Sequence, residues 1–159
     1  MNKEEKVLRE NLVAFLKGRQ TAMNFDDAVK NFPEKDINKK APNVNYSFWH
    51  LIEHIRITQN DILDFSINPD YKYKDASEYW PRLTSKATKK DWDKTVRLFR
   101  KDLKALIKLI EDPKSDLYKP FPWGNGQTLL REAILTAEHN SYHVGELGIL
   151  RQVVDSWKN

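Results

Sequence analysis

Apolar residues recur at the spacing of an amphipathic α-helix in four long stretches of the chain. These stretches cover about residues 4–19, residues 46–65, a third run from residue 89 to Asp112-Pro113, and residues 128–157. The third run shows the period most clearly, at Val96, Phe99, Leu103, Leu106, Ile107 and Ile110. A short extra helical turn is expected near residues 26–30, and no stretch alternates at the strand period.

Segments rich in proline and glycine separate the four stretches, at residues 31–45, 68–85 and 113–126. Four amphipathic helices without strands predict an all-α four-helix bundle, formed as a single domain over residues 1–159. The long connections argue against a minimal bundle with tight hairpins. Gly124-Asn125-Gly126 is expected to be a turn that starts the last helix, with Asn125 or Thr128 as its N-cap.

The composition excludes several kinds of chemistry. The chain has no cysteine, which rules out thiol nucleophiles, disulfides and iron–sulfur clusters and is typical of a reducing compartment. The charged start, residues 1–6, leads into the first helical pattern without a signal peptide, and no segment reaches the roughly 18 apolar residues of a membrane span. We therefore expect a cytoplasmic protein without a membrane partner.

The net charge of +4 does not indicate a nucleic-acid interface. The lysines are spread along the chain among acidic residues, whereas a nucleic-acid groove usually gathers basic residues on one face. The sequence contains neither a recognition helix nor an aromatic stacking platform. A solvated lysine surface is the preferred interpretation, with an anion-binding surface as the alternative, and no specific nucleic-acid binding is expected.

All four histidines occur in two pairs of equal spacing: His50 with His54, and His139 with His143. Residues four apart lie on one face of a helix, so two facing helices could bring several imidazoles to one point, as a divalent transition metal requires. Three such ligands would leave a coordination position open. The spacing alone does not decide between a metal site and histidines that are hydrogen-bonded in the core.

The neighbours of these histidines refine the expectation. His54 shares its helix face with apolar residues and should point into the bundle, whereas His50 lies at the edge of that face. Glu146 follows His143 by three residues, within reach along a helix. Gly145 and Gly148 lie inside the last helix and could permit the close approach of another helix or subunit. Three tryptophans could line a pocket mouth near the helix ends: Trp49, Trp80 and Trp123.

Two segments carry a resemblance to a known family. Residues 47–56 read SFWHLIEHIR, and residues 124–147 join GNGQTLLRE to the motif H-N-x-Y-H-x-G. With these motifs the chain resembles the DinB-like (DinB/YfiT) superfamily of metalloenzymes over nearly its whole length. The resemblance implies a four-helix bundle with up-down-down-up connectivity. It also implies a divalent metal held by His54, His139 and His143.

Two positions depart from the family pattern. His50 lies where relatives often have glutamine, so the resemblance does not support it as a ligand, and a fourth-ligand role remains an alternative. Glu146 lies where glutamine is common. Its carboxylate could accept a hydrogen bond from a ligand imidazole or act as a base near a metal-bound water, or it could face solvent or another subunit.

The resemblance also implies a class of reaction, because characterised relatives include transferases and isomerases that use low-molecular-weight thiols such as bacillithiol or mycothiol. We expect a metal-dependent enzyme of the thiol-transferase or hydrolase type, with a small-molecule substrate and a thiol cosubstrate. Zinc and nickel are the first expectations for a site made of imidazoles, with copper, iron and manganese as alternatives. The alternative function is a non-catalytic metal-binding protein of the stress or damage response, with a vestigial site. A homodimer formed through helix faces is a further expectation.

Overall fold

The computed structural model describes residues 1–18 and 20–157. Its elements are α1 (Lys3–Lys17), α2 (Phe25–Val29), the 3₁₀ turn η1 (Glu34–Asp36), α3 (Phe48–Ile67), the 3₁₀ turn η2 (Ala76–Tyr79), α4 (Lys89–Glu111) and α5 (Leu129–Val153). The described part of the chain contains no β-strand, apart from an isolated bridge between Pro120 and Thr128. None of its helices combines the length and hydrophobicity that a membrane span needs. The all-α prediction is confirmed.

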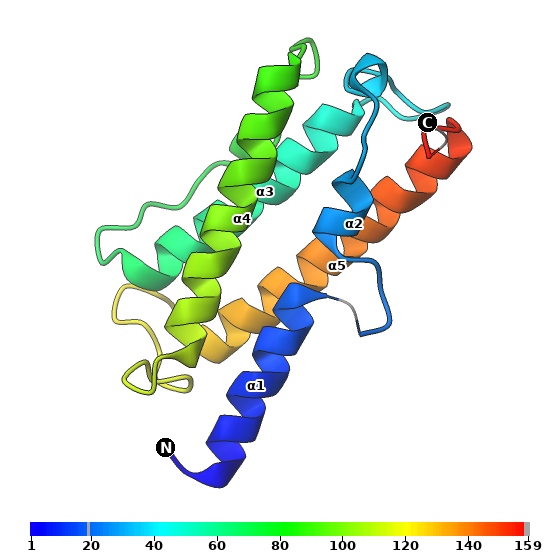
Figure 1. Ribbon diagram of the computed structural model, residues 1–159. Coiled ribbons are helices and arrows are strands. Elements are labelled where there is room, and N and C mark those ends of the chain that lie inside the picture. Colours follow the sequence, from blue (N-terminus) through cyan, green and yellow to red (C-terminus); the bar gives the residue numbers. More distant parts are fainter. Residues whose placement is uncertain (19, 158–159) are drawn as a thin grey trace.

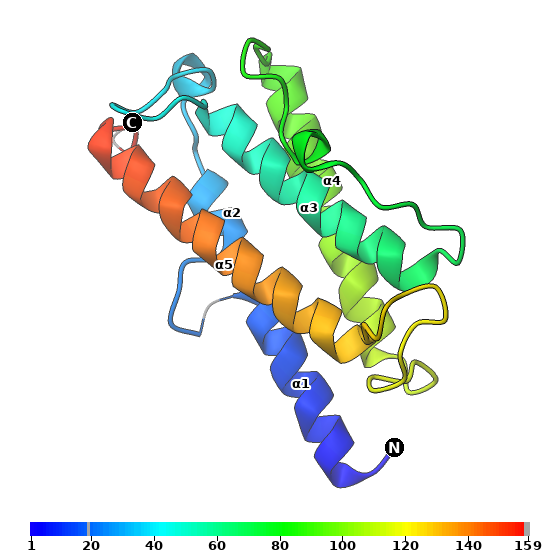
Figure 2. The same ribbon diagram turned by 180° about the vertical axis from the view of Figure 1, so that it is seen from behind.

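The four long helices have the connectivity that the family resemblance implies. In Figure 1, α1 and α5 run upward from their first residues, whereas α3 and α4 run downward. Figure 2 shows the same directions from behind. Because α3 and α4 are parallel, the segment between them must return along the bundle, which explains its length.

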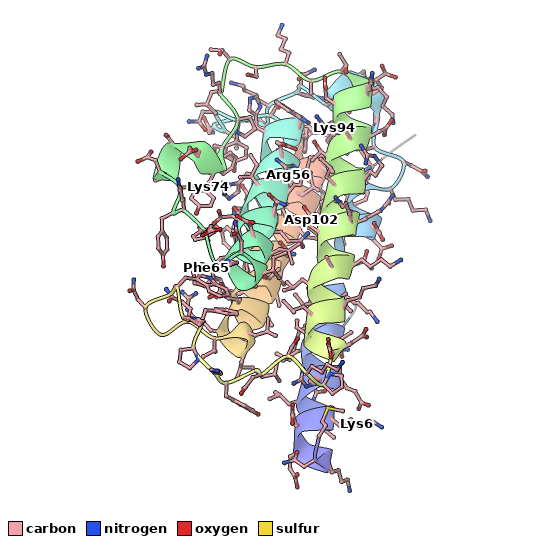
Figure 3. The ribbon with its side chains drawn as sticks, turned by 90° about the vertical axis from the view of Figure 1, so that its left-hand side faces the viewer. Lys6, Arg56, Phe65, Lys74, Lys94 and Asp102 are labelled. Atoms are coloured by element: carbon pink, nitrogen blue, oxygen red, sulfur yellow. The ribbon has the colours of Figure 1, made fainter. Side chains whose placement is uncertain are left out.

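Helix α3 lies between α4 and α5 and contacts both, while α1 contacts α4 and α5, and the short α2 packs on α5. The connection from α3 to α4 carries Lys74 and η2 along the outer side of α3, as Figure 3 shows. This long connection places Tyr79 and Trp80 beside the middle of α3.

Side-chain caps start the helices at three hydroxyl residues. Ser47, Thr88 and Thr128 each accept a hydrogen bond from the backbone N–H three residues further on. Such caps satisfy N–H groups that have no partner inside the helix. Thr128, rather than Asn125, is therefore the N-cap of α5.

The helix ends differ slightly from the sequence-based bounds. Helix α1 ends at Lys17, and its expected limit, residue 19, lies outside the described residues. Gly18 follows with φ of +66°, and a Cβ atom there would lie 2.9 Å from Cβ of Asn24. Both the left-handed backbone conformation and the lack of space for a side chain favour glycine at this position. Helix α5 ends at Val153 rather than near residue 157, since Asp155 adopts the left-handed conformation.

The core fixes which face of α3 meets the rest of the bundle. Leu51, Ile52 and Ile55 are fully buried, and burial of side chains of this size stabilises the fold by about 1.5–3 kcal/mol each. Their burial leaves His54 at the boundary between α3 and α5. The expected helix approach at Gly145 is not found, because no described atom outside its own stretch of α5 lies within 4 Å of a Cβ built there, whereas Gly148 faces Met23.

Candidate metal centre

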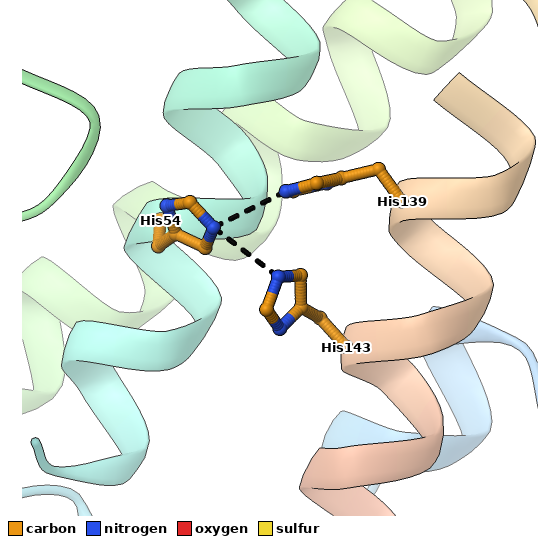
Figure 4. Close-up of side chains that lie close together, drawn as sticks. All are labelled: His54, His139 and His143. Atoms are coloured by element: carbon orange, nitrogen blue, oxygen red, sulfur yellow. Dashed lines mark hydrogen bonds between the residues drawn. The ribbon is translucent and has the colours of Figure 1, made fainter. Parts of the chain in front are cut away.

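Three histidines meet between α3 and α5. Nε2 of His54 lies 3.1 Å from Nε2 of His139 and 3.3 Å from Nε2 of His143. One ligand atom from each of the three residues lies within 4.8 Å of the other two. Figure 4 shows His54 reaching from one helix towards the two histidines of the other. These are the three residues that the resemblance implied, and the structure brings them together.

Local geometry explains the convergence. His139 and His143 are four residues apart, so α5 presents both on the face that packs on α3. His54 is held on the opposite side by the ring of Trp80, which stacks on it with centroids 4.0 Å apart and an interplanar angle of 6°. The three imidazoles therefore occupy defined positions.

Two of the outer ring nitrogens face groups that can only accept hydrogen bonds. Nδ1 of His54 lies 2.8 Å from the backbone oxygen of Tyr79, and Nδ1 of His143 lies 2.7 Å from Oε2 of Glu146. Each Nδ1 must therefore carry the proton and donate it. In the neutral ring, Nε2 then has its lone pair directed into the cluster, as a metal ligand requires.

The spacing of the nitrogens fits a transition-metal ion. An ion bound about 2.0–2.1 Å from two imidazole nitrogens holds those nitrogens about 2.9–3.4 Å apart. The separations of 3.1 and 3.3 Å between Nε2 of His54 and the Nε2 atoms of its two partners fall within this range. Without a cation, the inward lone pairs of His54 and His143 would face each other at 3.3 Å, which is repulsive.

The electrostatic surroundings favour the neutral form of two of the rings, His54 and His139. Burial lowers the pKa of His54, although the hydrogen bond to Tyr79 acts in the opposite direction. Burial and then the neighbouring His143 and His54 lower the pKa of His139 to about 4. Neutral imidazoles are the form that binds metal, so no proton needs to be displaced from His139 near pH 7.

Glu146 is held as a carboxylate. Burial acts to raise its pKa, but hydrogen bonds from His143 and Tyr46 outweigh burial and lower it. The Tyr46 hydroxyl donates to Oε1, and burial together with this bond raises the pKa of Tyr46. Glu146 therefore accepts from a candidate ligand on one oxygen and from a tyrosine on the other.

The comparison with known families agrees with this geometry. The sequence pattern of the DinB superfamily matches residues 18–147. The chain belongs to the DinB superfamily. No curated protein and no solved structure matches it. All three clustered histidines lie inside the matched range, so the DinB region contains the complete candidate centre.

His50 has a different place in this DinB domain. Its Nδ1 lies 3.2 Å from the backbone nitrogen of Ser47 and 2.5 Å from the hydroxyl of that residue, and its Nε2 lies 3.0 Å from the backbone oxygen of Arg82. Both ring nitrogens are thus engaged away from the cluster. His50 completes the cap of α3 and ties it to the long connection.

Sequence reasoning missed two contributors to the site. Tyr79 acts through its backbone oxygen, which no side-chain pattern can reveal. Tyr46 was expected to begin the second helix, but the helix starts after Ser47, and the tyrosine instead reaches α5. Of the three tryptophans considered for a pocket mouth, Trp80 is the one that stacks on a clustered histidine.

A surface hollow lies beside Glu146, the residue that contacts His143. His139 and His143 are half-buried, while His54 is buried. This hollow, of about 390 Å³, is lined by Tyr142, Gly145, Glu146, Ile149 and Leu150 and by none of the three histidines. A larger apolar cavity of about 780 Å³ lies between α1, α4 and α5, and none of the three histidines lines it.

Proposed function

We propose that this DinB-superfamily protein is a divalent-metal-dependent enzyme of the thiol-transferase or hydrolase type. The observation that carries the proposal is the convergence of Nε2 atoms from His54, His139 and His143. Three protein ligands leave at least one position for a substrate or solvent molecule, which distinguishes catalytic sites from closed structural ones.

A cation held by three neutral ligands keeps its full positive charge. It would lower the pKa of a bound thiol or water molecule. Burial favours the neutral form of His54 and His139, and hydrogen bonds orient His54 and His143. Because its pKa is lowered, Glu146 is a weak base. It is therefore better suited to orienting the ring of His143 than to acting as a general base. Tyr46 fixes the carboxylate in place.

A thiol cosubstrate is compatible with the composition of the chain. The protein has no cysteine, so a sulfur nucleophile must come from a second molecule. The hollow beside Glu146, which contacts His143, offers room for a small molecule, and Tyr142 and Ile149 give it an apolar wall. We propose zinc or nickel as the ion because every candidate ligand is an imidazole, with iron or manganese as alternatives.

Metal analysis of protein purified without a histidine tag tests the first part of the proposal. The protein is stripped with a chelator and titrated with zinc, nickel, iron and manganese ions in turn. We expect one ion bound per chain by the wild type and loss of stoichiometric binding in His139→Ala. Unchanged loading of this variant would contradict the proposed centre.

Activity measurements then distinguish an enzyme from a non-catalytic metal-binding protein. Metal-loaded wild-type protein is screened for conjugation of low-molecular-weight thiols to small electrophiles and for hydrolysis of small esters and amides. We expect turnover that disappears on chelation and in His139→Ala. Metal binding without turnover would favour the non-catalytic metal-binding protein.

A further inference from the structure

The outer nitrogen of His139 differs from those of its two partners in the cluster. His54 and His143 each direct Nδ1 at an acceptor, 2.8 and 2.7 Å away. Nδ1 of His139 is buried and has no hydrogen-bond partner of normal geometry among the described residues. A buried N–H without an acceptor costs about 1–3 kcal/mol, so an acceptor is expected close by.

A matching acceptor lies on the next residue of α5. Asn140 is 7% exposed, and its Oδ1 is also buried without a partner in the described chain. Buried side chains of this kind nearly always find a hydrogen bond. An unpaired donor position and an unpaired acceptor therefore occur on consecutive residues at the candidate centre.

The hydrogen bonds behind Asn140 determine which of its amide atoms is free. The backbone oxygen of Phe99 can only accept, so the group of Gln59 that lies 2.8 Å from it must be Nε2. Oε1 of Gln59 then accepts from Nδ2 of Asn140, at 2.9 Å. The atom that remains on Asn140 is Oδ1, which can accept but not donate.

Burial keeps this arrangement from reversing. Gln59 is fully buried and joins α3 to α4 through Phe99, and Asn140 joins α5 to α3 through Gln59. Turning either amide over would place two donors or two acceptors against each other. The orientation of both side chains is thus set by a backbone carbonyl on a helix that carries none of the clustered histidines.

We propose that Asn140 is a positioning residue of the metal centre, whose Oδ1 accepts a hydrogen bond from Nδ1–H of His139 while Gln59 holds Asn140 in register. This inference rests on the proposed function, since the Nδ1–H form is the one that directs the Nε2 lone pair at a metal. Each of the three imidazoles then has one acceptor behind it: a carbonyl, a carboxylate and an amide.

Three variants test the inference, with zinc ion as the probe and chelator competition as the measurement. Asn140→Leu removes the acceptor, and we expect zinc affinity to fall by about 10- to 100-fold. Asn140→Asp keeps an acceptor for His139 and adds a charge while losing the donor to Gln59, so its affinity should equal or exceed that of the wild type. Thr136→Val is the control, because this buried hydroxyl bonds only within its own helix, and its affinity should not change.

The contrast between leucine and aspartate separates positioning from stability. Thermal unfolding of the metal-free proteins should show both Asn140 variants destabilised, because both break the bond to Gln59. A purely structural role predicts that zinc affinity falls equally in the two variants, and that result would overturn the inference. Unchanged affinity in Asn140→Leu would overturn it as well.

A second measurement needs no variant and applies even if Asn140→Leu does not fold. Cobalt(II)-loaded wild-type protein is examined by proton NMR in water and in deuterium oxide. We expect three exchangeable, strongly shifted Nδ1–H resonances, with that of His139 protected from rapid exchange. Absence of the His139 resonance would contradict the proposal. A wild-type protein that binds neither zinc nor cobalt would refute the proposed function itself, and this inference with it.

Discussion

Nδ1 of His143 lies 2.7 Å from Oε2 of Glu146, three residues further along α5. The other oxygen of the same carboxylate accepts from the hydroxyl of Tyr46, which lies just before α3. Glu146 and Tyr46 thus fix the ring of His143, a candidate ligand, from the side opposite the cluster. A carboxylate behind a metal-binding imidazole makes a charge-assisted hydrogen bond and increases the basicity of the ligand.

The first prediction concerns this carboxylate. Glu146→Gln keeps an acceptor but removes the charge, so we expect zinc affinity to fall by about tenfold, and by up to about 100-fold in Glu146→Ala. Chelator competition measures both. Tyr46→Phe is the matched control because it removes a bond to the carboxylate but leaves the carboxylate itself. Equal affinities of the wild type and Glu146→Ala would show that the contact does not support metal binding.

The second prediction separates His50 from the other histidines. His50→Gln should leave zinc stoichiometry and affinity unchanged, because both ring nitrogens contact Ser47 and Arg82 instead of the cluster. The same variant should lower the free energy of unfolding by about 1 kcal/mol, since it weakens the cap of α3. Urea unfolding and zinc titration check the two parts. Loss of bound zinc in this variant would place His50 in the centre after all.

The comparison of these histidines shows what spacing in a sequence can reveal. Both pairs have the same i, i+4 spacing, and it correctly indicated that imidazoles from two helices meet. It could not distinguish His54 from His50, because their difference arises from contacts with the 3₁₀ turn and the connection after it: Tyr79 for one and Arg82 for the other. The positions of backbone carbonyls on a long loop cannot be predicted from the pattern of side chains in the sequence.

The helices themselves were largely predictable, with α5 as the instructive exception. The strong period of α4 located that helix within a residue or two. In α5, Ile134 and Ile149 are exposed whereas Glu132 and Asn140 are buried, so its apolar pattern does not reveal the inward face. A helix that places polar residues in the core for chemistry and orientation departs from the simple rule of apolar inside.

The third prediction concerns a buried cation at the end of α5. Arg151 is 1% exposed and donates to the backbone oxygens of Ala28, Lys30 and Ser156, while its guanidinium lies 3.6 Å from the ring centroid of Trp157. A lysine cannot reach these acceptors together. We expect Arg151→Lys to lower the free energy of unfolding by about 2–4 kcal/mol, and Trp157→Ala by about 1 kcal/mol. Denaturant unfolding measures both losses. A lysine variant as stable as the wild type would show that the three carbonyl contacts contribute little.

The last prediction concerns Glu132, a buried acid that pairs with the exposed Arg131. Burial raises the pKa of Glu132, although the partly exposed Arg131 beside it acts to lower it, and the charge of Asp61 adds to the rise. Just above the ordinary value of 4.5 for a glutamate, the folded protein therefore binds more protons at this position than the unfolded chain. Stability falls with rising pH wherever the folded state binds more protons, so Glu132 makes stability decline from its ordinary pKa up to its raised one.

Glu132→Gln removes this dependence, because the amide stays neutral in both states. The free energy of unfolding of the variant, minus that of the wild type, should increase as the pH rises from about 4 to about 8. Urea unfolding of both metal-free proteins across this range gives the difference, and titration of the histidines cancels in it. Asp93→Asn serves as the control for removing a carboxylate from the surface, because Asp93 forms an exposed pair with Lys89. A difference for Glu132→Gln that decreases with pH would mean that Arg131 outweighs burial and that the carboxylate stabilises the fold.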